Sequence, residues 1–255
     1  GGMYALVTND DGIDSPGLIP LAHAALDAGY KVLVAAPNKQ YSGAGASLDG
    51  EPEESGFKVS QQRPDGLSTE VEAIAVHASP ALIAYGATLQ FFGSRPDIVL
   101  SGVNLGPNVG PAVVHSGTVG AALTAAAMRI PALAASMSTM RPRQWDTAQN
   151  IISRVLPTVP SLPLDGRILN LNIPDLELAD VRGVKAAALG RYANSADEAA
   201  DQVKMLLGGD AIVNLLSQFE EGTDGLLLSQ GWATLSLVQG PMHEVNGFHL
   251  PETTF

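Results

Sequence analysis

The chain of 255 residues is 45% apolar and 16% charged, a composition typical of a globular protein with a sizeable core. Its 26 acidic and 14 basic residues give a formal net charge of −12, which argues against duplex nucleic acid and anionic membranes as partners. Without cysteine, a run of membrane-spanning length or a secretory leader, we expect a cytoplasmic protein that lacks disulfides, thiolate catalysis and cysteine-bound zinc.

The first elements form a strand–helix–strand unit. Residues 4–8 are a short apolar, β-branched run that predicts a buried strand. Pro16 and Gly29 bracket apolar residues at helical spacing, which predicts a helix between them. Residues 31–36 predict a second strand, ended by Pro37. This unit implies a parallel pair of strands with a right-handed crossover.

Alternation of strands and helices continues to about residue 159 and predicts an α/β core with a doubly wound, mostly parallel sheet. Residues 37–70 interrupt the alternation as a Gly-, Ser- and acid-rich excursion with a weak strand at 57–60. The other core elements are predicted strands at 71–76, 97–100 and 131–137, a helix that Ser79 caps and that runs to 89, and a helix that Ser116 caps and that runs to 128.

The pattern of predicted elements changes in the second half of the sequence, which has less helix. Predicted strands lie at 168–173, 181–189 and 233–238, and Gly222-Thr223-Asp224 is interpreted as a turn. We therefore divide the chain into a core domain, 3–160, and a C-terminal extension, 161–255. We expect the extension to be antiparallel in part and to make contacts between subunits.

The strongest functional signal is the pair of adjacent carboxylates, Asp10 and Asp11, directly after the first strand and before Gly12. Adjacent aspartates are often ordinary turn residues. At the carboxyl end of a parallel strand, however, they stand where ligands bind, and their repulsion calls for a cation. A hard divalent ion such as Mg²⁺ or Mn²⁺, held by oxygen ligands, is the simplest interpretation.

Two further loops that follow predicted strands supply neutral oxygens for the same site. Ser42 and Asn104 complete a predicted metal set with Asp10 and Asp11, although Ser42 is also interpretable as a loop hydroxyl and Asn104 as a turn residue. We also expect the loops to present substrate-binding groups. These are Asn9, Gly43 and Asn108, of which Asn108 has the same alternative as a turn residue.

Ser116-Gly117-Thr118 begins the alanine-rich helix, as an N-cap, an anion site or both. We favour a phosphate bound by the free N–H groups of this helix end. His115 beside it is a candidate general acid, with a structural role as the alternative. His23 and His77 lie in apolar contexts and are interpreted as structural.

Several other classes fit less well. The first loop has acids where a dinucleotide-binding fold needs glycines, and no G-x-S-x-G nucleophile elbow is present. An aspartyl-phosphate phosphatase needs a second aspartate where Gly12 stands. A phospho-receiver domain is about half this length and needs a further aspartate and a lysine at later strand ends. A metal-dependent nucleotide-binding regulator without turnover stays open.

Four groups of residues resemble, in order and spacing, the SurE family of survival-protein nucleotidases. They are Val7-Thr-Asn-Asp-Asp-Gly12, Pro37 with Ser42-Gly43, Ser101-Gly-Val-Asn104 with Gly106 and Asn108, and Ser116-Gly-Thr-Val119. The resemblance covers residues 3–135. It continues more weakly through Leu171-Asn-Ile-Pro174, Leu189-Gly-Arg191 and Gly222-Thr-Asp224.

The resemblance implies a Rossmann-like core, a C-terminal extension exchanged between subunits, and a homodimer or homotetramer. It also implies a phosphatase that depends on one divalent metal ion per subunit and acts on nucleoside 5′- or 3′-monophosphates, sometimes on polyphosphate. By matching position, Asp10, Asp11, Ser42 and Asn104 would bind the metal. Ser116, Gly117 and Thr118 would meet the phosphate.

The chain departs from the family pattern at Tyr41, at His115 and in the segment Ala78-Ser-Pro-Ala-Leu-Ile83, which is usually Gly-Thr-Pro-Ala-Asp-Cys. Leu82 replaces an acid, Tyr41 stands where arginine is common, and His115 stands where tyrosine is common. The metal set is intact while its surroundings differ, so a specialised non-nucleotide or modified-nucleoside phosphomonoester is the alternative substrate. In either case we expect Asp10 or Asp11 to act in catalysis by accepting the proton of the attacking water.

Overall fold

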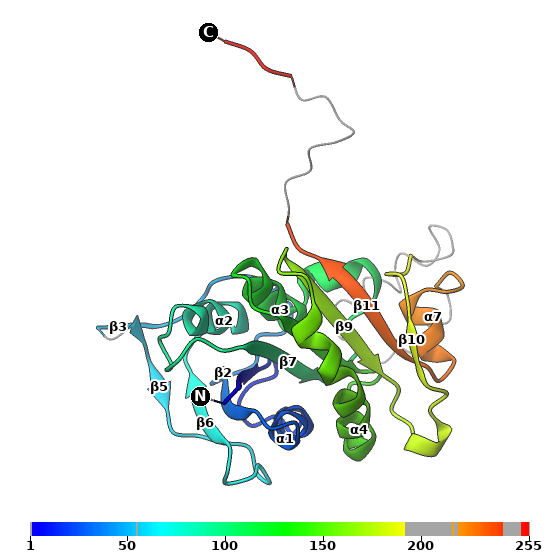
Figure 1. The fold of residues 1–255 in the computed structure, drawn as a ribbon, viewed down its shortest axis with the longest axis horizontal. Coiled ribbons are helices and arrows are strands. Elements are labelled where there is room, and N and C mark those ends of the chain that lie inside the picture. Colours follow the sequence, from blue (N-terminus) through cyan, green and yellow to red (C-terminus); the bar gives the residue numbers. More distant parts are fainter. Residues whose placement is uncertain (1, 55, 192–215, 217–218, 242–250, 255) are drawn as a thin grey trace.

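The computed structural model describes residues 2–54, 56–191, 216, 219–241 and 251–254, and is shown in Figure 1. Within these residues, the main sheet has nine strands in the order β10-β11-β9-β8-β7-β1-β2-β6-β5, and β3 and β4 form a separate pair. The strands are β1 (Tyr4–Thr8), β2 (Lys31–Pro37), β3 (Pro52–Glu53), β4 (Gly56–Phe57), β5 (Val59–Ser60), β6 (Glu72–Val76), β7 (Ile98–Asn104), β8 (Ala132–Met137), β9 (Arg167–Ile173), β10 (Val184–Ala186) and β11 (Ala233–Gln239).

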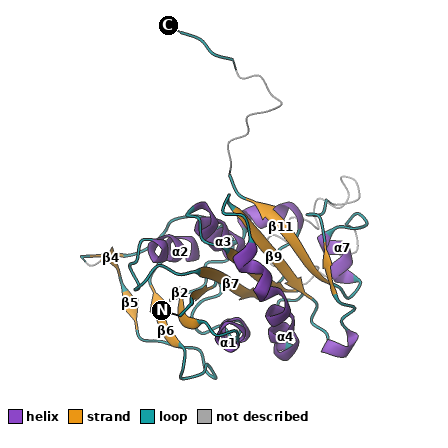
Figure 2. Ribbon diagram, in the orientation of Figure 1, coloured by secondary structure: helices purple, strands orange, loops and turns teal. Residues whose placement is uncertain are grey.

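Helices cover both faces of the sheet, as Figure 2 shows with strands in orange between helices in purple. The α-helices are α1 (Leu18–Asp27), α2 (Pro80–Thr88), α3 (Gly117–Ala127), α4 (Trp145–Val155) and α7 (Asp224–Ser229), and the 3₁₀ helices are η1 (Gly110–His115), η2 (Leu156–Ser161) and η3 (Leu178–Asp180). None of the described helices is both long and apolar enough to cross a membrane. The predicted α/β class with a mostly parallel sheet is confirmed.

The central strands bury both of their faces, so successive residues enter different cores. Val7 and Val34 belong to the cluster beneath α1 and α4, whereas Leu6 and Leu33 belong to the cluster beneath α2 and α3. This arrangement explains why these strands are apolar runs rather than alternating patterns. The α3 helix is rich in alanine and glycine, and these small residues let it lie close to the sheet.

The order of the strands places a crevice beside β1. The chain runs outward from β1 to β2 and β6, then returns to β7 on the other side of β1. The direction of winding therefore reverses between β1 and β7. Ligands of open α/β sheets bind at the carboxyl ends of the strands at such a switch point. The loops that begin at Asn9 and Leu105 both emerge there.

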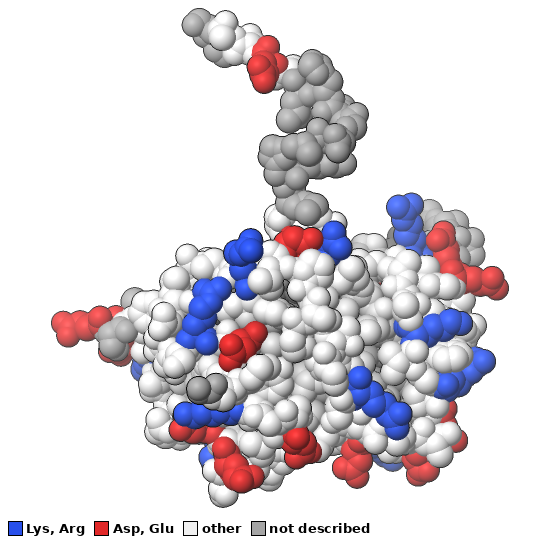
Figure 3. Space-filling model, in the orientation of Figure 1, with Lys and Arg blue, Asp and Glu red and all other residues white. Residues whose placement is uncertain are grey.

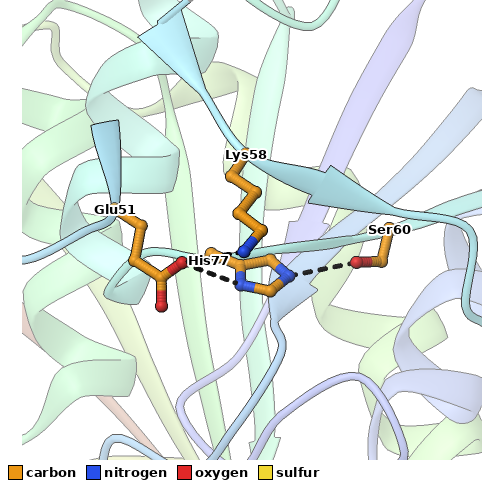
Figure 4. A network of polar contacts seen from close by, with 4 residues as sticks. All are labelled: Glu51, Lys58, Ser60 and His77. Carbon is orange, nitrogen blue, oxygen red and sulfur yellow. Dashed lines mark hydrogen bonds and ion pairs between the residues drawn. The ribbon is translucent and has the colours of Figure 1, made fainter. Parts of the chain in front are cut away.

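The excursion between β2 and β6 is held to the body by aromatic and polar contacts. The ring of Phe57 packs edge-on against Phe91, with ring centroids 5.3 Å apart. Figure 4 shows the polar network: Ser60 Oγ lies 3.0 Å from His77 Nε2, and His77 Nδ1 lies 3.4 Å from Glu51 Oε2. His77 thus joins two segments of the excursion, as a structural residue would, although its partners are polar rather than apolar. His23 is also structural, since its Nε2 accepts the N–H of Ser68 over 3.0 Å.

The second half extends the same sheet. β9 runs parallel to β8, β11 runs antiparallel to β9, and β10 forms the edge. The expected antiparallel pairing is thus confirmed, but the strand predicted at 181–189 is limited to the three residues of β10. As an edge strand it has one partner, β11, and all three residues are exposed. Within 161–255, residues 192–215, 217–218, 242–250 and 255 lie outside the described part.

Charged side chains are scattered over the face drawn in Figure 3. Asp and Glu gather along its lower edge, whereas Lys and Arg lie in separate places on its left and right sides. On this face, the molecule offers no continuous basic surface to a polyanion.

Candidate metal and phosphate site

The loops at the carboxyl ends of β1, β2 and β7 surround a pocket of about 170 Å³. The pocket lies at the switch point of the sheet, where the sequence predicted a site. The predicted site residues that line it are Asp10, Ser42, Gly43, Asn104, Asn108, His115 and Ser116. The structure therefore brings together residues from the three connections that follow β1, β2 and β7.

Asp10 is the most buried carboxylate of the site, with 4% of its surface exposed. Its Oδ1 accepts a hydrogen bond of 3.1 Å from Thr118 Oγ1. A Cβ built on Gly117 would lie 2.9 Å from Asp10 Cβ and 3.2 Å from Oδ2, so only glycine lets α3 approach this closely. Burial, followed by the neighbouring charge of Asp11, raises the pKa of Asp10 to about 7.

Asp11 reaches from the end of β1 to the loop after β7. Its Oδ2 accepts the backbone N–H of Leu105 over 3.1 Å. Burial raises the pKa of Asp11, and hydrogen bonds from Leu105 and Gln40 partly offset that rise. Asp11 is less buried than Asp10 and is not one of the residues that line the pocket wall.

Ser42 and Asn104 present neutral oxygens to the same pocket. Ser42 lies exposed in a turn that is tied to the first loop, because Tyr41 donates its N–H to the Asp10 carbonyl over 2.7 Å. Asn104 Nδ2 donates to the Gly106 carbonyl over 2.8 Å. The amide thus closes a turn, as one interpretation predicted, and leaves its Oδ1 as the oxygen available to a ligand.

These donors fit a hard divalent cation. No ion pair with Lys or Arg joins Asp10 or Asp11 in the described part of the chain, so the repulsion between them is not relieved by a basic side chain there. Nor do the described residues contain a cluster of three or more His, Cys, Asp or Glu that could hold a metal ion. A metal at this pocket would therefore combine two carboxylates with a hydroxyl and an amide oxygen, a set suited to Mg²⁺ or Mn²⁺.

The N-terminus of α3 borders the site on the face of the sheet that α2 and α3 cover. Ser116 is its N-cap, since Ser116 Oγ accepts the N–H of Val119 over 3.0 Å. Ser116 also lines the pocket, whereas Gly117 and Thr118 do not. Both of these contact Asp10, so the positive end of the helix is directed at this carboxylate. His115, the last residue of η1, is exposed at the rim.

Two predicted residues are engaged with the protein itself. Asn9 is buried, and its amide donates to the Gly12 carbonyl over 2.9 Å and accepts the Gly12 N–H over 3.0 Å. It shapes the turn that presents the two aspartates. Asn108 lines the pocket, but its Nδ2 donates to Ser136 Oγ over 2.8 Å. The side-chain amides of Asn9 and Asn108 therefore both make hydrogen bonds that stabilise the loops of the site.

Sequence reasoning missed the residues that hold the far wall. Asn170 and Asn172 of β9 donate to the Asn108 carbonyl over 2.9 and 3.0 Å. Their signal was available, because two asparagines at alternate positions interrupt an otherwise apolar strand. The apolar part of the pocket was also missed, since its residues belong to no motif. It consists of Leu105, Pro107, Val109, Ala112 and Met140.

Leu82, which replaces an acid of the family pattern, lies outside this pocket. It lines a separate apolar depression beside α2, together with Phe57 and Phe91. A Cβ built on Gly50 would lie 2.9 Å from Leu82 Cδ2, so the leucine packs against the excursion. This departure therefore changes the packing of the excursion and leaves the wall of the pocket unaltered.

Fold and pocket together define an α/β protein with an acidic, oxygen-rich site at the switch point of a mostly parallel sheet. Residues 5–196 match the family described as survival protein SurE, and the chain belongs to this SurE family.

Similar proteins carry nucleotidase names. The 5′/3′-nucleotidase SurE of Edwardsiella ictaluri is 37% identical over 189 residues, which are 74% of this chain and 70% of that protein. The 5′-nucleotidase SurE of Alkaliphilus metalliredigens is 35% identical over 205 residues, 78% of each chain. The crystal structure of the SurE protein from Aquifex aeolicus superposes with a TM-score of 0.70 at 25% identity, covering 92% of this chain and 93% of that one.

Proposed function

We propose that this protein is a phosphomonoesterase that depends on a divalent metal ion and hydrolyses nucleoside 5′- or 3′-monophosphates. The observation that carries the proposal is the buried Asp10 carboxylate, which lies beside Asp11 and beneath the N-terminus of α3 in an open pocket. The nucleotidase names of the relatives that are 35% to 37% identical support the same activity.

Four residues would hold the metal ion, one per subunit: Asp10, Asp11, Ser42 and Asn104. When bound, Mg²⁺ or Mn²⁺ neutralises phosphate charge and lowers the pKa of a water molecule. The carboxylates are oriented before any ligand arrives, since Thr118 fixes Asp10 and the Leu105 N–H fixes Asp11. Such orientation by surrounding hydrogen bonds is a general property of metal sites.

The phosphate would bind between this metal set and the start of α3. Ser116 lines the pocket there, and Gly117 and Thr118 supply the N-terminal end of the helix dipole. This end favours the negative charge that develops on the phosphoryl oxygens during transfer. Local attraction of this kind overcomes the long-range repulsion expected from a chain with a net charge of −12.

Two groups would move protons in the proposed reaction. Oδ1 of Asp10 is engaged by Thr118, so Oδ2 of Asp10 or a carboxylate oxygen of Asp11 would accept the proton of the attacking water. His115 lies at the rim beside Ser116, where it would donate a proton to the leaving alkoxide.

The screen that tests the proposal measures phosphate release from nucleoside monophosphates, sugar phosphates and polyphosphate, with Mg²⁺ or Mn²⁺ and with EDTA. We expect nucleoside monophosphates to be hydrolysed and EDTA to abolish turnover. Hydrolysis confined to another phosphomonoester would identify the specialised substrate instead. Metal-dependent nucleotide binding without phosphate release would identify a regulator and refute the enzymatic proposal.

We propose further that the protein assembles as a homodimer or homotetramer through its C-terminal part. The apolar surface over β9, β10 and β11 supports this, because Leu237 is 53% exposed and Val184 is 40% exposed. Exposed apolar surface of this kind commonly marks contacts between proteins. Light scattering of the purified protein at several concentrations measures the assembly, and a monomer throughout would contradict it.

A further inference from the structure

One wall of the pocket is held from far along the chain by Asp224, the first residue of α7. Its Oδ2 accepts the N–H of Gly110 over 3.0 Å, and its Oδ1 accepts the N–H groups of Gly190 and Gly225 over 2.8 Å each. Gly110 lies 114 positions earlier in the sequence and is the first residue of η1. The carboxylate thus joins the C-terminal part of the molecule to the pocket loop.

Asp224 lies in a tightly packed, buried environment formed by three glycines and Phe219. Its side chain is completely buried, and a Cβ on Gly190 would lie 3.0 Å from its Oδ1. The ring of Phe219 packs against Gly110, Gly190 and Gly225, each at a distance that leaves no room for a Cβ. Three glycines therefore bring their N–H groups to one buried acceptor, which makes strong, charge-assisted hydrogen bonds.

The bond to Gly110 bears directly on the site, because η1 is a single short segment. It begins at Gly110 and ends at His115, and the next residue, Ser116, caps α3. Both of these later residues line the pocket. A displacement of Gly110 would be carried through η1 to the proton donor and to the phosphate end of the site.

Other hydrogen bonds hold the same loop further upstream. Asp11 holds Leu105 at its beginning, and Asn170 and Asn172 hold the carbonyl of Asn108. Asp224 holds the downstream part, nearest to His115. The loop is thus fixed to the metal end of the site at one end and to the C-terminal part of the chain at the other.

We propose that Asp224 is a positioning residue for catalysis, which sets the place of His115 and Ser116 through its bond to the Gly110 N–H. The proposal rests on the phosphomonoesterase function proposed above. It assigns to the C-terminal part of the chain a role within the active site of its own subunit. Only the carboxylate can serve all three N–H groups, since an amide would turn an NH₂ group toward one of its donors.

The test replaces Asp224 by Asn in the full-length, metal-loaded protein. In D224N, we expect amide exchange of residues 105–116 to accelerate and kcat for a nucleoside monophosphate to fall by about tenfold or more. The affinity for Mn²⁺, measured by calorimetry, should change by less than about twofold, because Asp10 and Asp11 keep their own partners. D224S, which keeps a small acceptor at the helix start but cannot reach Gly110, replaces D224N if the latter does not fold.

V238A is the matched control, because Val238 is buried in the core beneath α3 and its removal destabilises the fold without touching the loop. We expect V238A to keep the slow exchange of 105–116 and the kcat of the unaltered protein. The proposal is overturned if D224N retains full kcat, if exchange of the loop is unchanged, or if V238A lowers kcat as much. Failure of the proposed function would show differently, as an absence of turnover in the unaltered protein, while the exchange data still decide whether Asp224 holds the loop.

Discussion

Thr118 Oγ1 donates to Asp10 Oδ1 over 3.1 Å, and this bond joins the N-terminus of α3 to the end of β1. The two residues lie 108 positions apart in the sequence, and of the two only Asp10 lines the pocket. The hydroxyl favours the ionised form and so opposes the rise in the pKa of Asp10 that burial and the charge of Asp11 cause. The helix that would receive the phosphate thus also prepares the metal ligand.

Thr118→Val tests this relationship, because valine keeps the shape of threonine and removes only the hydroxyl. We expect the affinity for Mn²⁺ at pH 7 to fall by about tenfold, the usual effect of losing a hydrogen-bond partner of a metal ligand. Calorimetric titration measures it. Thr124→Val is the control, since Thr124 lies on the same helix and its hydroxyl donates to the Gly120 carbonyl rather than to a residue of the site. Equal affinities in the two variants would refute the role assigned to Thr118.

Asp11→Asn should abolish phosphate release while the fold stays intact. The substitution is nearly isosteric and can still accept the Leu105 N–H, but it removes one of the two negative charges that would hold the cation. Turnover and the circular dichroism melting curve measure the two effects. Asp14→Asn, an exposed aspartate of the same loop, is the comparison and should remain active. Full turnover in the Asp11 variant would exclude this carboxylate from the mechanism.

Removal of the metal should make stability depend on pH in a defined direction. The pKa of Asp10 in the metal-free fold is raised to about 7, above its ordinary value of 3.8, so the fold binds this proton more tightly than the unfolded chain does. In EDTA, the contribution of the Asp10 proton to the free energy of unfolding is therefore complete below about pH 4. This contribution is lost as the pH rises to about 7. Mn²⁺ should restore more stability at pH 8 than at pH 5, because a proton no longer competes with it.

Thermal unfolding at pH 5, 6, 7 and 8, with EDTA and with Mn²⁺, measures this dependence. Asp10→Asn is the control, since it has no proton to lose and should flatten the part of the curve between about pH 4 and 7. A metal-free melting temperature that rises through this range in the unaltered protein, and equally in the variant, would show that Asp10 does not govern it.

The part of the site that could be predicted from the sequence follows from topology. The apolar run at 4–8 and the strand that ends near Leu100 predict parallel strands. Parallel strands bring their carboxyl ends to one edge of the sheet. The position of Asp10 and Asn104 in one pocket follows from that rule alone. Ser116 was predictable as an N-cap for a local reason, because its partner is the N–H three residues later.

The hydrogen bonds that the side chains of Asn9 and Asn108 make to the protein itself could not be predicted from topology. An amide in a loop serves equally well to close a turn or to meet a ligand, and the residue type does not distinguish the two. Asn9 bonds within its own turn, whereas Asn108 bonds to Ser136 on a neighbouring strand. Which of these occurs depends on where the strands lie in space.

Asp224 shows most clearly what local sequence patterns cannot predict. Its local sequence, after Gly222 and Thr223, is typical of a turn, and a turn does precede it at Glu221 and Gly222. Interpreting Asp224 itself as part of a turn was wrong, because it opens α7 and is buried against Gly110. A partner 114 positions away leaves no trace in local patterns, so only the three-dimensional structure reveals it.

Met140→Ala should alter the choice of substrate rather than the chemistry. Met140 belongs to the apolar part of the pocket, and a Cβ on Gly106 would meet its sulfur, so the side chain covers this stretch of the loop. An unbranched, polarisable side chain at this place suits a planar leaving group such as a nucleoside. Its removal should raise KM for nucleoside monophosphates by about threefold to tenfold and leave methyl phosphate, which has no such group, unaffected.

The two substrates are compared in the same Mn²⁺ buffer, so that any change in metal loading affects both alike. Leu164→Ala, a substitution of a leucine that is 44% exposed and lies outside the pocket, controls for the loss of an apolar side chain as such. If KM rises equally for both substrates, Met140 shapes the phosphate end rather than the leaving-group end. That result would move the nucleoside to a different wall of the pocket, since the apolar residues on this side would then carry no specificity.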